Sequence, residues 1–368
     1  MPDIGTGISS QLVYAPEATG DFGVAPDLAS NEPLEFKSET FALQKTTVQG
    51  QGLHAGGLFD RAARRVLTNY AVTGGITIDL PTRFIGNLIQ HMVGSFGQTL
   101  ATPTEISTTG VYKSVHLPGT LFGNSLCFQK GVPDVDTGAV EPFTYVGCKI
   151  SDWEISVATG ALAQLTLTVD GRNELAGSGN GDPLNASVPD LATFDSLPGS
   201  GADLSSFHFR EATLYTGGTP SISGGLVSVS GGSAAGNIST VAVKETKALD
   251  TGRYFIGSSG FKAEQLENGF RQVTGSFTIE WLNSEAMYDA FAADTTQTLR
   301  LTFVGPIIGT SGSNTALFEI LLPNVKLDGE SPQVSGPQVV TQNVSFTALD
   351  DEATAPYQII FQSEDSAL

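Results

Sequence analysis

The chain has 368 residues, more than one ordinary hydrophobic core needs and enough for two domains. Apolar residues make up 40% and charged residues 15%, with 43 glycines and 18 prolines, which is typical of a turn-rich β protein rather than a helical or disordered one. The net charge of −20 argues against adhesion to duplex DNA, RNA or anionic membranes.

The N-terminal segment "MPDIGTGISSQLVYAPE" has no basic region and no apolar run, so no signal peptide is expected. No segment approaches the roughly 18 apolar residues of a membrane-spanning helix, and no membrane contact is predicted. We therefore expect the chain to be made and kept in a cytoplasm, unless it leaves as part of a larger object. Cys127 and Cys148 could pair or remain thiols, and they form neither a disulfide framework nor a CxxC metal motif.

One strand pattern occurs twice. "VTGGITIDL" at 72–80 returns as "VTGSFTIEW" at 273–281. In both copies apolar and polar residues alternate, which predicts a strand with one buried and one solvent-facing side. Asp79 and Glu280 occupy equivalent places on the polar side.

A short amphipathic helix is predicted after each copy of this strand. "PTRFIGNLIQHM" and "NSEAMYDAFAAD" place apolar pairs four residues apart, with Thr82 and Ser284 as the expected N-caps. Each helix would have about three turns, too short to be stable alone, so each must pack on a sheet.

The closing part of the repeat is a pair of strands. "KISDWEISVATGALAQLTLTVDGRNE" in the first copy corresponds to "KLDGESPQVSGPQVVTQNVSFTALDDE" in the second. Trp153 and Trp281 both fall in strand patterns that indicate core or interface positions. Residues 94–140 form a longer, turn-rich connection in the first copy.

These patterns predict a first domain at 1–172, a linker rich in Gly, Pro, Ser and Asp at 173–206, and a second domain at 207–368. A low-complexity insert at 216–237 could be a loose hairpin tip or a contact arm. Tandem duplication often serves no special purpose, but two similar domains in one chain also allow three chains to build a ring with sixfold pseudosymmetry.

Residues that carry catalytic or metal chemistry are scattered. The four histidines, His54, His91, His116 and His208, lack metal-ligand spacing, and His91 is expected to sit as a cation at a helix C-terminus. The acidic run Asp350, Asp351 and Glu352 is expected to be solvated, and no nucleophile elbow or phosphate loop occurs. We predict no catalytic residue, no cofactor-binding residue, no metal site and no enzyme. Arg61, Arg64 and Arg65, the densest basic cluster, are expected to form salt bridges between subunits.

The chain resembles the tail tube proteins (major tail proteins) of long, flexible-tailed siphovirus-type bacteriophages, especially their two-domain form. The resemblance is carried by "YAPEATGDFGVAP", by the two strand-to-helix segments "RRVLTNYAVTGGITIDL" and "ENGFRQVTGSFTIEW", by "FHFREATLYTGG" with "ISTVAVKETKALDTGRYFIG", and by "FEILLPNVKLDG" with "NVSFTALDD". It covers most of the chain except the inserts.

The resemblance implies a mainly β fold of two tandem β-sandwich or half-barrel domains, each with one short α-helix. Subunits of that family join edge to edge into a ring-shaped β-barrel, and rings stack into a virion tail tube through which genomic DNA passes. The implied partners are the chain itself, in homotrimeric rings, and the tape measure, tail terminator and distal tail or baseplate proteins; DNA passes without tight binding. Assembly would take place in the host cytoplasm.

The net charge has two interpretations. It could serve solubility alone, or it could partly line a bore that repels DNA phosphate evenly, with Asp79 and Glu280 as candidate bore-facing acids. A ring would also pair the free edges of the β domains.

Three alternatives remain at this point. The chain could be a two-domain β binding module, such as a capsid-decorating or adhesive protein, although aromatic residues for ligand contact are few. It could be a hydrolase with an unrecognised site. Within the tail tube interpretation, the second copy could decorate a ring of six chains, but it keeps the helix and both flanking strands, which favours three.

Overall fold

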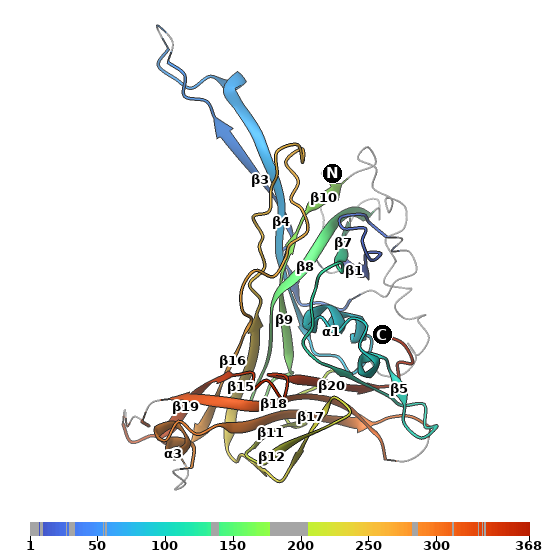
Figure 1. Ribbon diagram of the computed structural model, residues 1–368, viewed down its shortest axis with the longest axis vertical. Helices are drawn as coiled ribbons and strands as arrows, with labels where there is room; N and C mark the ends of the chain where they lie inside the picture. The colour runs from blue at the N-terminus through green and yellow to red at the C-terminus, as the bar shows by residue number, and fades with distance from the viewer. Residues whose placement is uncertain are drawn as a thin grey trace.

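A computed structural model describes residues 7, 10–26, 28, 34–53, 55, 57–133, 140–176, 205–281, 286–310, 313–329, 331–332, 334 and 336–368. The protein is mainly β, as predicted, and its strands form an open, layered arrangement with one long ribbon projecting from the body (Figure 1).

The central feature is a long antiparallel run of strands that crosses both halves of the chain. Its order is β3, β4, β9, β8, β15, β16, β19 and β18, and the whole run is called the long sheet below. The strands are β3 (Ala42–Gln49), β4 (Arg65–Asp79), β9 (Gln164–Gly171), β8 (Val140–Ala158), β15 (Ile238–Thr246), β16 (Gln272–Glu280), β19 (Thr341–Ala348) and β18 (Thr315–Gly329). The short β2 (Ser38–Glu39) extends the line of β3 along β4.

A second layer packs against the long sheet. In the first half it contains β1 (Gln11–Pro16), β7 (Leu126–Pro133) and β10 (Asn173–Ala176). In the second half it contains β11 (Ala212–Thr216), β14 (Ser233–Ala234), β17 (Gln297–Ile307) and β20 (Gln358–Ser363). Two strands from the first half of the chain, β5 (Thr104–Glu105) and β6 (Tyr112–His116), join this part of the layer because β6 pairs with β20.

Two long strands belong to both layers. The first part of β8 pairs with β7, and from Asp152 onward β8 pairs with β15. The first part of β18 pairs with β17 and β20, and its last residues pair with β19. The two halves therefore use the same device, a strand that bends from the second layer into the long sheet.

The predicted alternation is visible in burial. Ile76 and Ile78 of β4 are buried, as are Phe277 of β16 and Phe346 of β19, while the polar residues between them reach solvent. Most buried apolar side chains of both halves belong to one continuous cluster, and a smaller separate cluster contains Val13, Ala15, Leu28, Cys127 and Val146. The strands predicted at 72–80 and 273–281 are thus confirmed, and they share a core.

The helices are α1 (Gly86–Val93) and α3 (Ala286–Ala292), with short 3-10 turns at Ala62–Arg64 and Thr99–Ala101. Both helices pack on the strands as expected: α1 buries Leu88 and Ile89, and α3 lies against β18. With eight residues α1 has only about two turns rather than three.

The predicted N-cap at Thr82 is wrong, because α1 begins at Gly86 and the Thr82 hydroxyl instead bonds Ser205. Phe84, two residues before the start of α1, has a positive φ of 64°, and its N–H donates to the Asp365 carboxylate at 2.8 Å. The Asp365 carboxylate, near the C-terminus, thus satisfies the Phe84 N–H at a position where the sequence predicted helix. Ser284 lies outside the described residues.

Parts of the expected linker and insert are ordered strands. Asn173–Ala176, at the start of the expected linker, forms β10 and pairs with β8, while 177–204 lie outside the described residues. The insert contains the hairpin of β12 (Thr219–Ser223) and β13 (Leu226–Ser230), followed by β14. Gln358 accepts from and donates to the Val227 backbone, which fixes the hairpin on the body. The domain boundaries themselves stay a prediction.

In the described part of the chain, neither helix has the length and apolar character needed to cross a membrane.

Candidate assembly surfaces

The two halves meet through strand pairing between β8 and β15. Asp152–Ala158 lie antiparallel to Thr240–Thr246, and Ile155 stands opposite Val243. Both of these side chains are buried, so the junction has an apolar side as well as a hydrogen-bonded ladder. The two repeats are therefore joined by the pairing of one strand from each, β8 and β15, within a single sheet.

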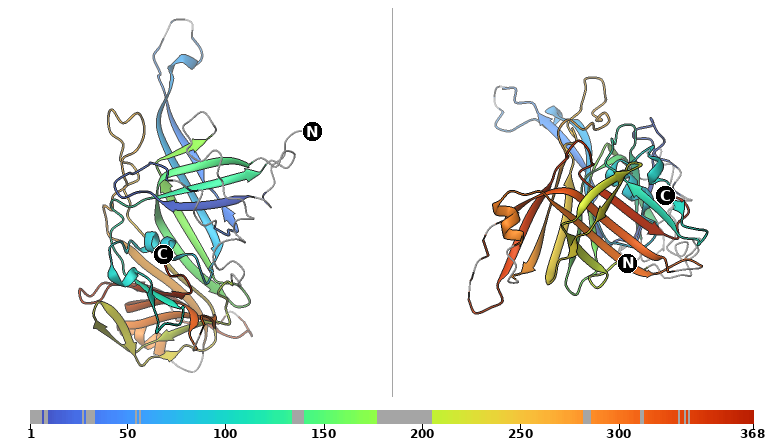
Figure 2. Two further views of the ribbon diagram at one scale, coloured as in Figure 1. Left: turned by 90° about the vertical axis from the view of Figure 1, so that its right-hand side faces the viewer. Right: turned by 60° about the horizontal axis from the view of Figure 1, so that its bottom comes forward.

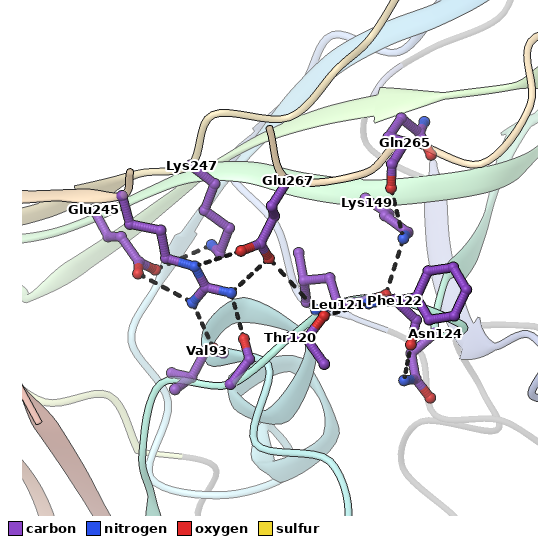
Figure 3. A network of polar contacts seen from close by, with 12 residues as sticks. Val93, Thr120, Leu121, Phe122, Asn124, Lys149, Glu245, Lys247, Gln265 and Glu267 are labelled. Atoms are coloured by element: carbon purple, nitrogen blue, oxygen red, sulfur yellow. Dashed lines mark hydrogen bonds and ion pairs between the residues drawn. The ribbon is translucent and has the colours of Figure 1, made fainter. Parts of the chain in front are cut away.

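A buried network of charges closes one end of this junction (Figure 3). Glu245 of β15 has no exposed surface and forms ion pairs with Lys247 at 3.1 Å and with Arg271 at 3.3 Å. Trp153 of β8 donates its indole N–H to Glu245 at 2.6 Å. Arg271 also pairs with Glu267 at 2.6 Å. Buried charges persist only when opposite charges offset them, as the two cations here offset the carboxylates.

The same network reaches α1. Arg271 donates to the carbonyl oxygens of Val93, at the end of α1, and of Gly119. Burial lowers the pKa of Lys247 and of Lys149, whose ammonium group donates to the Leu121 carbonyl and pairs with Glu264 at 2.6 Å. The connection between β15 and β16 is thereby fastened to the first half of the chain.

The long sheet has two open edges. Within the described residues, β3 pairs on one side only, with β4. At the other end Lys326–Gly329 of β18 pair with β19 and have no ladder partner on their other side among those residues. An open strand edge presents unpaired N–H and C=O groups and is a template for another chain.

One face of the long sheet is polar across both halves. Neighbours across successive strands share a face, and one such row is Asp79, Gln164, Ser156, Ala242, Ser276, Ser345 and Asp328. The next row is Thr77, Thr166, Glu154, Lys244, Thr274, Thr347 and Lys326. None of these residues is buried. We call this surface the polar face.

Acids outnumber bases on the polar face. Its acids are Asp79, Asp152, Glu154, Glu280 and Asp328, and its lysines are Lys244 and Lys326. The two acids singled out from the sequence, Asp79 and Glu280, both lie on it, at the ends of β4 and β16. Asp79 forms a surface ion pair with Lys37 at 3.2 Å, and Glu280 accepts from Asn237 at 2.6 Å.

His91 differs from expectation, while the other histidines have separate surroundings. His91 is not a solvated cation at a helix end: burial, reinforced by Lys149, lowers its pKa to about 3, so the ring is neutral at pH 7. Burial also lowers the pKa of His116 to about 4, and its ring nitrogens lie 2.7 Å from Ser95 Oγ and 3.0 Å from Ser114 Oγ. His208 pairs with Glu211 at the surface, and His54 lies outside the described residues.

The remaining candidate residues fall in three separate places. Cys127 and Cys148 are both buried and remain thiols. Among the described residues no group of His, Cys, Asp and Glu is arranged to hold a metal ion. The Asp350 and Asp351 carboxylates accept hydrogen bonds from amides of their own turn. Arg61, Arg64 and Arg65 are exposed at the base of the loop that joins β3 to β4.

Comparison with known proteins supplies the family. The family described as phage tail tube protein matches residues 7–348, nearly the whole chain. The chain belongs to the phage tail tube protein family.

Other comparisons add little. No curated protein matches the chain. Among solved structures, the crystal structure of DynU16, from the dynemicin biosynthetic locus, is 12% identical over 77% of this chain and 90% of that one, with a TM-score of 0.10. A score that low carries no information on fold or function.

As a tail tube protein, the chain is a structural component of a phage tail. The candidate surfaces for contact with other copies of the chain are the two open edges of the long sheet. Sequence reasoning missed the network around Glu245, although a signal was present: "VAVKET" places Glu245 in the inward phase set by Val241 and Val243. A charge in an inward position indicates a buried partner.

Proposed function

We propose that three chains close into one ring by repeating, between chains, the junction that β8 and β15 form within the chain. The β8–β15 junction is the observation that carries this proposal. In the repeat β3 corresponds to β15, because β3 precedes β4 as β15 precedes β16. The end of β18 corresponds to the end of β8, because each pairs with the closing strand of its repeat. The two open edges are thus the two partners of the internal junction.

The internal register predicts the external one. Thr246 stands opposite Asp152 in the internal junction. Gln44 is the counterpart of Thr246, because Gln44 pairs with Ala71 and Thr246 pairs with Gln272, each just before the repeated V-T-G. Asp328 is the counterpart of Asp152, because Asp328 pairs with Ser345 and Asp152 pairs with Thr168, the matching residues of the two closing strands. Gln44 of one chain is therefore placed opposite Asp328 of its neighbour.

In such a ring the polar face lines the bore. A wall of threonine, serine and acidic side chains offers no apolar patch and repels phosphate, so duplex DNA would slide without adhering. Stacked rings would form the tube through which the genome passes into the host. The role is structural, with no catalysis and no cofactor.

The proposed partners are further copies of the chain within and between rings, the tape measure inside the tube, and terminator and distal tail proteins at its ends. Both repeats contribute strands to the long sheet, which supports three chains per ring rather than six chains with a decorating second domain. Assembly is proposed to occur in the host cytoplasm.

Negative-stain electron microscopy of the purified protein tests the proposal. Rings with a hollow centre, alone or stacked, are the expected result. A monodisperse monomer over the full range of salt and protein concentration would contradict it.

A further inference from the structure

The ribbon of β3 and β4 ends in large apolar side chains that are exposed to solvent in the described part of the chain. The ribbon projects from the body (Figures 1 and 2), and at its end Leu53, Leu58 and Phe59 are 102%, 89% and 87% exposed. Exposed clusters of large apolar side chains mark contact surfaces. Asp60 follows Phe59, and after it come the three exposed arginines Arg61, Arg64 and Arg65, so that residues 60–65 carry a net charge of +2 on a chain whose net charge is −20. We call residues 50–53, 55 and 57–65 the arm.

The matching connection in the second repeat has a defined place. Residues 247–271 join β15 to β16, and they lie on the first half of the chain. Phe261 stacks on Tyr70 with ring centroids 5.1 Å apart, and the Arg172 guanidinium lies 5.8 Å from the Phe261 ring. Lys262 donates to both carboxylate oxygens of Asp170 at 2.7 Å. This connection therefore crosses from its own repeat onto the preceding one.

The arm and this connection occupy equivalent places in the two repeats, and the segment that contains the arm is one residue longer (45–70 against 247–271). Gln44 pairs with Ala71 as Thr246 pairs with Gln272, so Lys45 corresponds to Lys247. Counting forward from these two lysines, Phe59 and Phe261 stand at the same distance. Phe59 is thus the counterpart of an aromatic side chain that is docked on the preceding repeat.

The residue that would receive Phe59 is found from the contact of Phe261 with Arg172, because the counterpart of its stacking partner Tyr70 is Arg271, which belongs to the network around Glu245. Arg172, under Phe261, follows the last residue of β9 by one position. The residue with that relation to β19 is Leu349, whose side chain is 46% exposed.

Next to Leu349 come the exposed acids Asp350, Asp351 and Glu352. Hydrogen bonds from Thr354 lower the pKa of Asp351, so its carboxylate stays charged. The exposed Leu349 with its three acids has the opposite charge to the exposed Phe59 with the net positive segment 60–65, so the two surfaces are complementary.

We propose that the arm of each chain lies over the second half of the neighbouring chain in the same ring, with Phe59 on Leu349 and Arg61, Arg64 and Arg65 facing Asp350, Asp351 and Glu352. The proposal rests on the ring closure proposed above and adds a second contact to it. The arm binds a second copy of this chain, in the way that the connection 247–271 binds the first half of its own chain. The arm would add a contact beside the pairing of β3 with the end of β18 of the neighbouring chain and so stabilise it.

Disulfide trapping tests the contact. The variant Phe59→Cys with Leu349→Cys is assembled and oxidised, and products are separated without reductant; the native Cys127 and Cys148 are buried and do not interfere. A cross-linked ladder that stops at three chains is the expected result. The matched control, Phe59→Cys with Val304→Cys, keeps one exposed position and moves the other to β17, and it should give no product.

The ladder also separates this proposal from contacts between rings. A ladder that continues past three chains would place the arm on the next ring and would overturn the proposal. Rings that assemble but do not cross-link would overturn it as well, while leaving the ring closure intact. Absence of rings in the unmodified protein would instead contradict the proposed function itself.

Charge exchange provides an independent test. Reversing Arg61, Arg64 and Arg65 to Glu should lower the yield of rings about tenfold, since like charges would then face each other. Changing Asp350, Asp351 and Glu352 to Lys in the same chain should restore the yield. An unchanged yield in the first variant, or no recovery in the second, would refute the charged part of the contact.

Discussion

Glu245 is the residue on which the contact between the two repeats depends most. Its carboxylate lies in the core phase of β15 and satisfies Trp153, Lys247 and Arg271 together. Such a site tolerates the loss of a partner badly, because the remaining charge stays buried without compensation.

Arg271→Ala is therefore expected to lower the free energy of unfolding by about 3–5 kcal/mol. The substitution leaves Lys247 as the one ion-pair partner of Glu245, beside the Trp153 N–H, and removes the donors to Val93 and Gly119. Arg210→Ala, at an exposed position, serves as the control and should change stability by less than about 0.5 kcal/mol. Denaturant unfolding measures both, and equal effects would show that the network does not stabilise the junction.

His91 predicts how stability depends on pH. Its pKa is lowered from 6.5 in the unfolded chain to about 3 in the fold, so the native state binds fewer protons between these values. The stability it contributes is fully present above pH 6.5 and is lost as the pH falls toward 3.

The free energy of unfolding should accordingly fall by a few kcal/mol between pH 6.5 and 4, with His116 adding to the slope. His91→Leu should flatten that slope. An unaltered slope in the His91 variant would show that the buried ring does not cause the acid sensitivity.

At the scale of elements, the open edge of β3 decides assembly. In the internal junction Lys247 donates its N–H to the Ser151 carbonyl of the neighbouring repeat at 2.8 Å. Lys45 is its counterpart and is exposed. The backbone N–H of Lys45 is thus expected to bond the neighbouring chain.

Lys45→Pro removes that N–H and should abolish ring formation while the monomer stays folded, because proline is tolerated on an edge strand. Lys45→Ala keeps the N–H and should assemble normally. Circular dichroism checks the fold and electron microscopy checks the rings. Normal rings from the proline variant would rule out this edge as the contact between chains.

Much of this architecture could be predicted from the sequence, and the failures have physical causes. The repeated strands were predictable because alternation follows from one buried face, as Ile76, Ile78 and Phe277 show. The start of α1 was not, because Asp365 caps the Phe84 amide from 281 residues away, and no local pattern encodes that contact.

The pairing of β8 with β15 also escaped prediction. Alternation fixes which face of a strand is buried but not which strand lies beside it. His91 failed for a related reason: its place at the end of α1 is local, whereas its burial comes from packing against other elements.

For the whole molecule, the polar face should govern passage of DNA. Replacing Asp79 and Glu280 with Lys adds positive charge to the proposed bore. Assembled tubes of this variant should retain linear duplex DNA at low salt, several-fold above the unmodified tubes, and release it as salt rises. Asp21→Lys with Asp289→Lys, at exposed acids off the polar face, is the control of equal net charge. Equal retention by both variants would place the polar face outside the bore.

The ring itself is tested most directly by an electron cryomicroscopy map of the assembled protein at a resolution that separates strands. We expect three chains per ring, a continuous inner sheet in which β3 of each chain lies antiparallel to the end of β18 of the next, and Gln44 opposite Asp328. Six chains per ring, or an inner sheet interrupted at β3, would contradict the repetition of the internal junction.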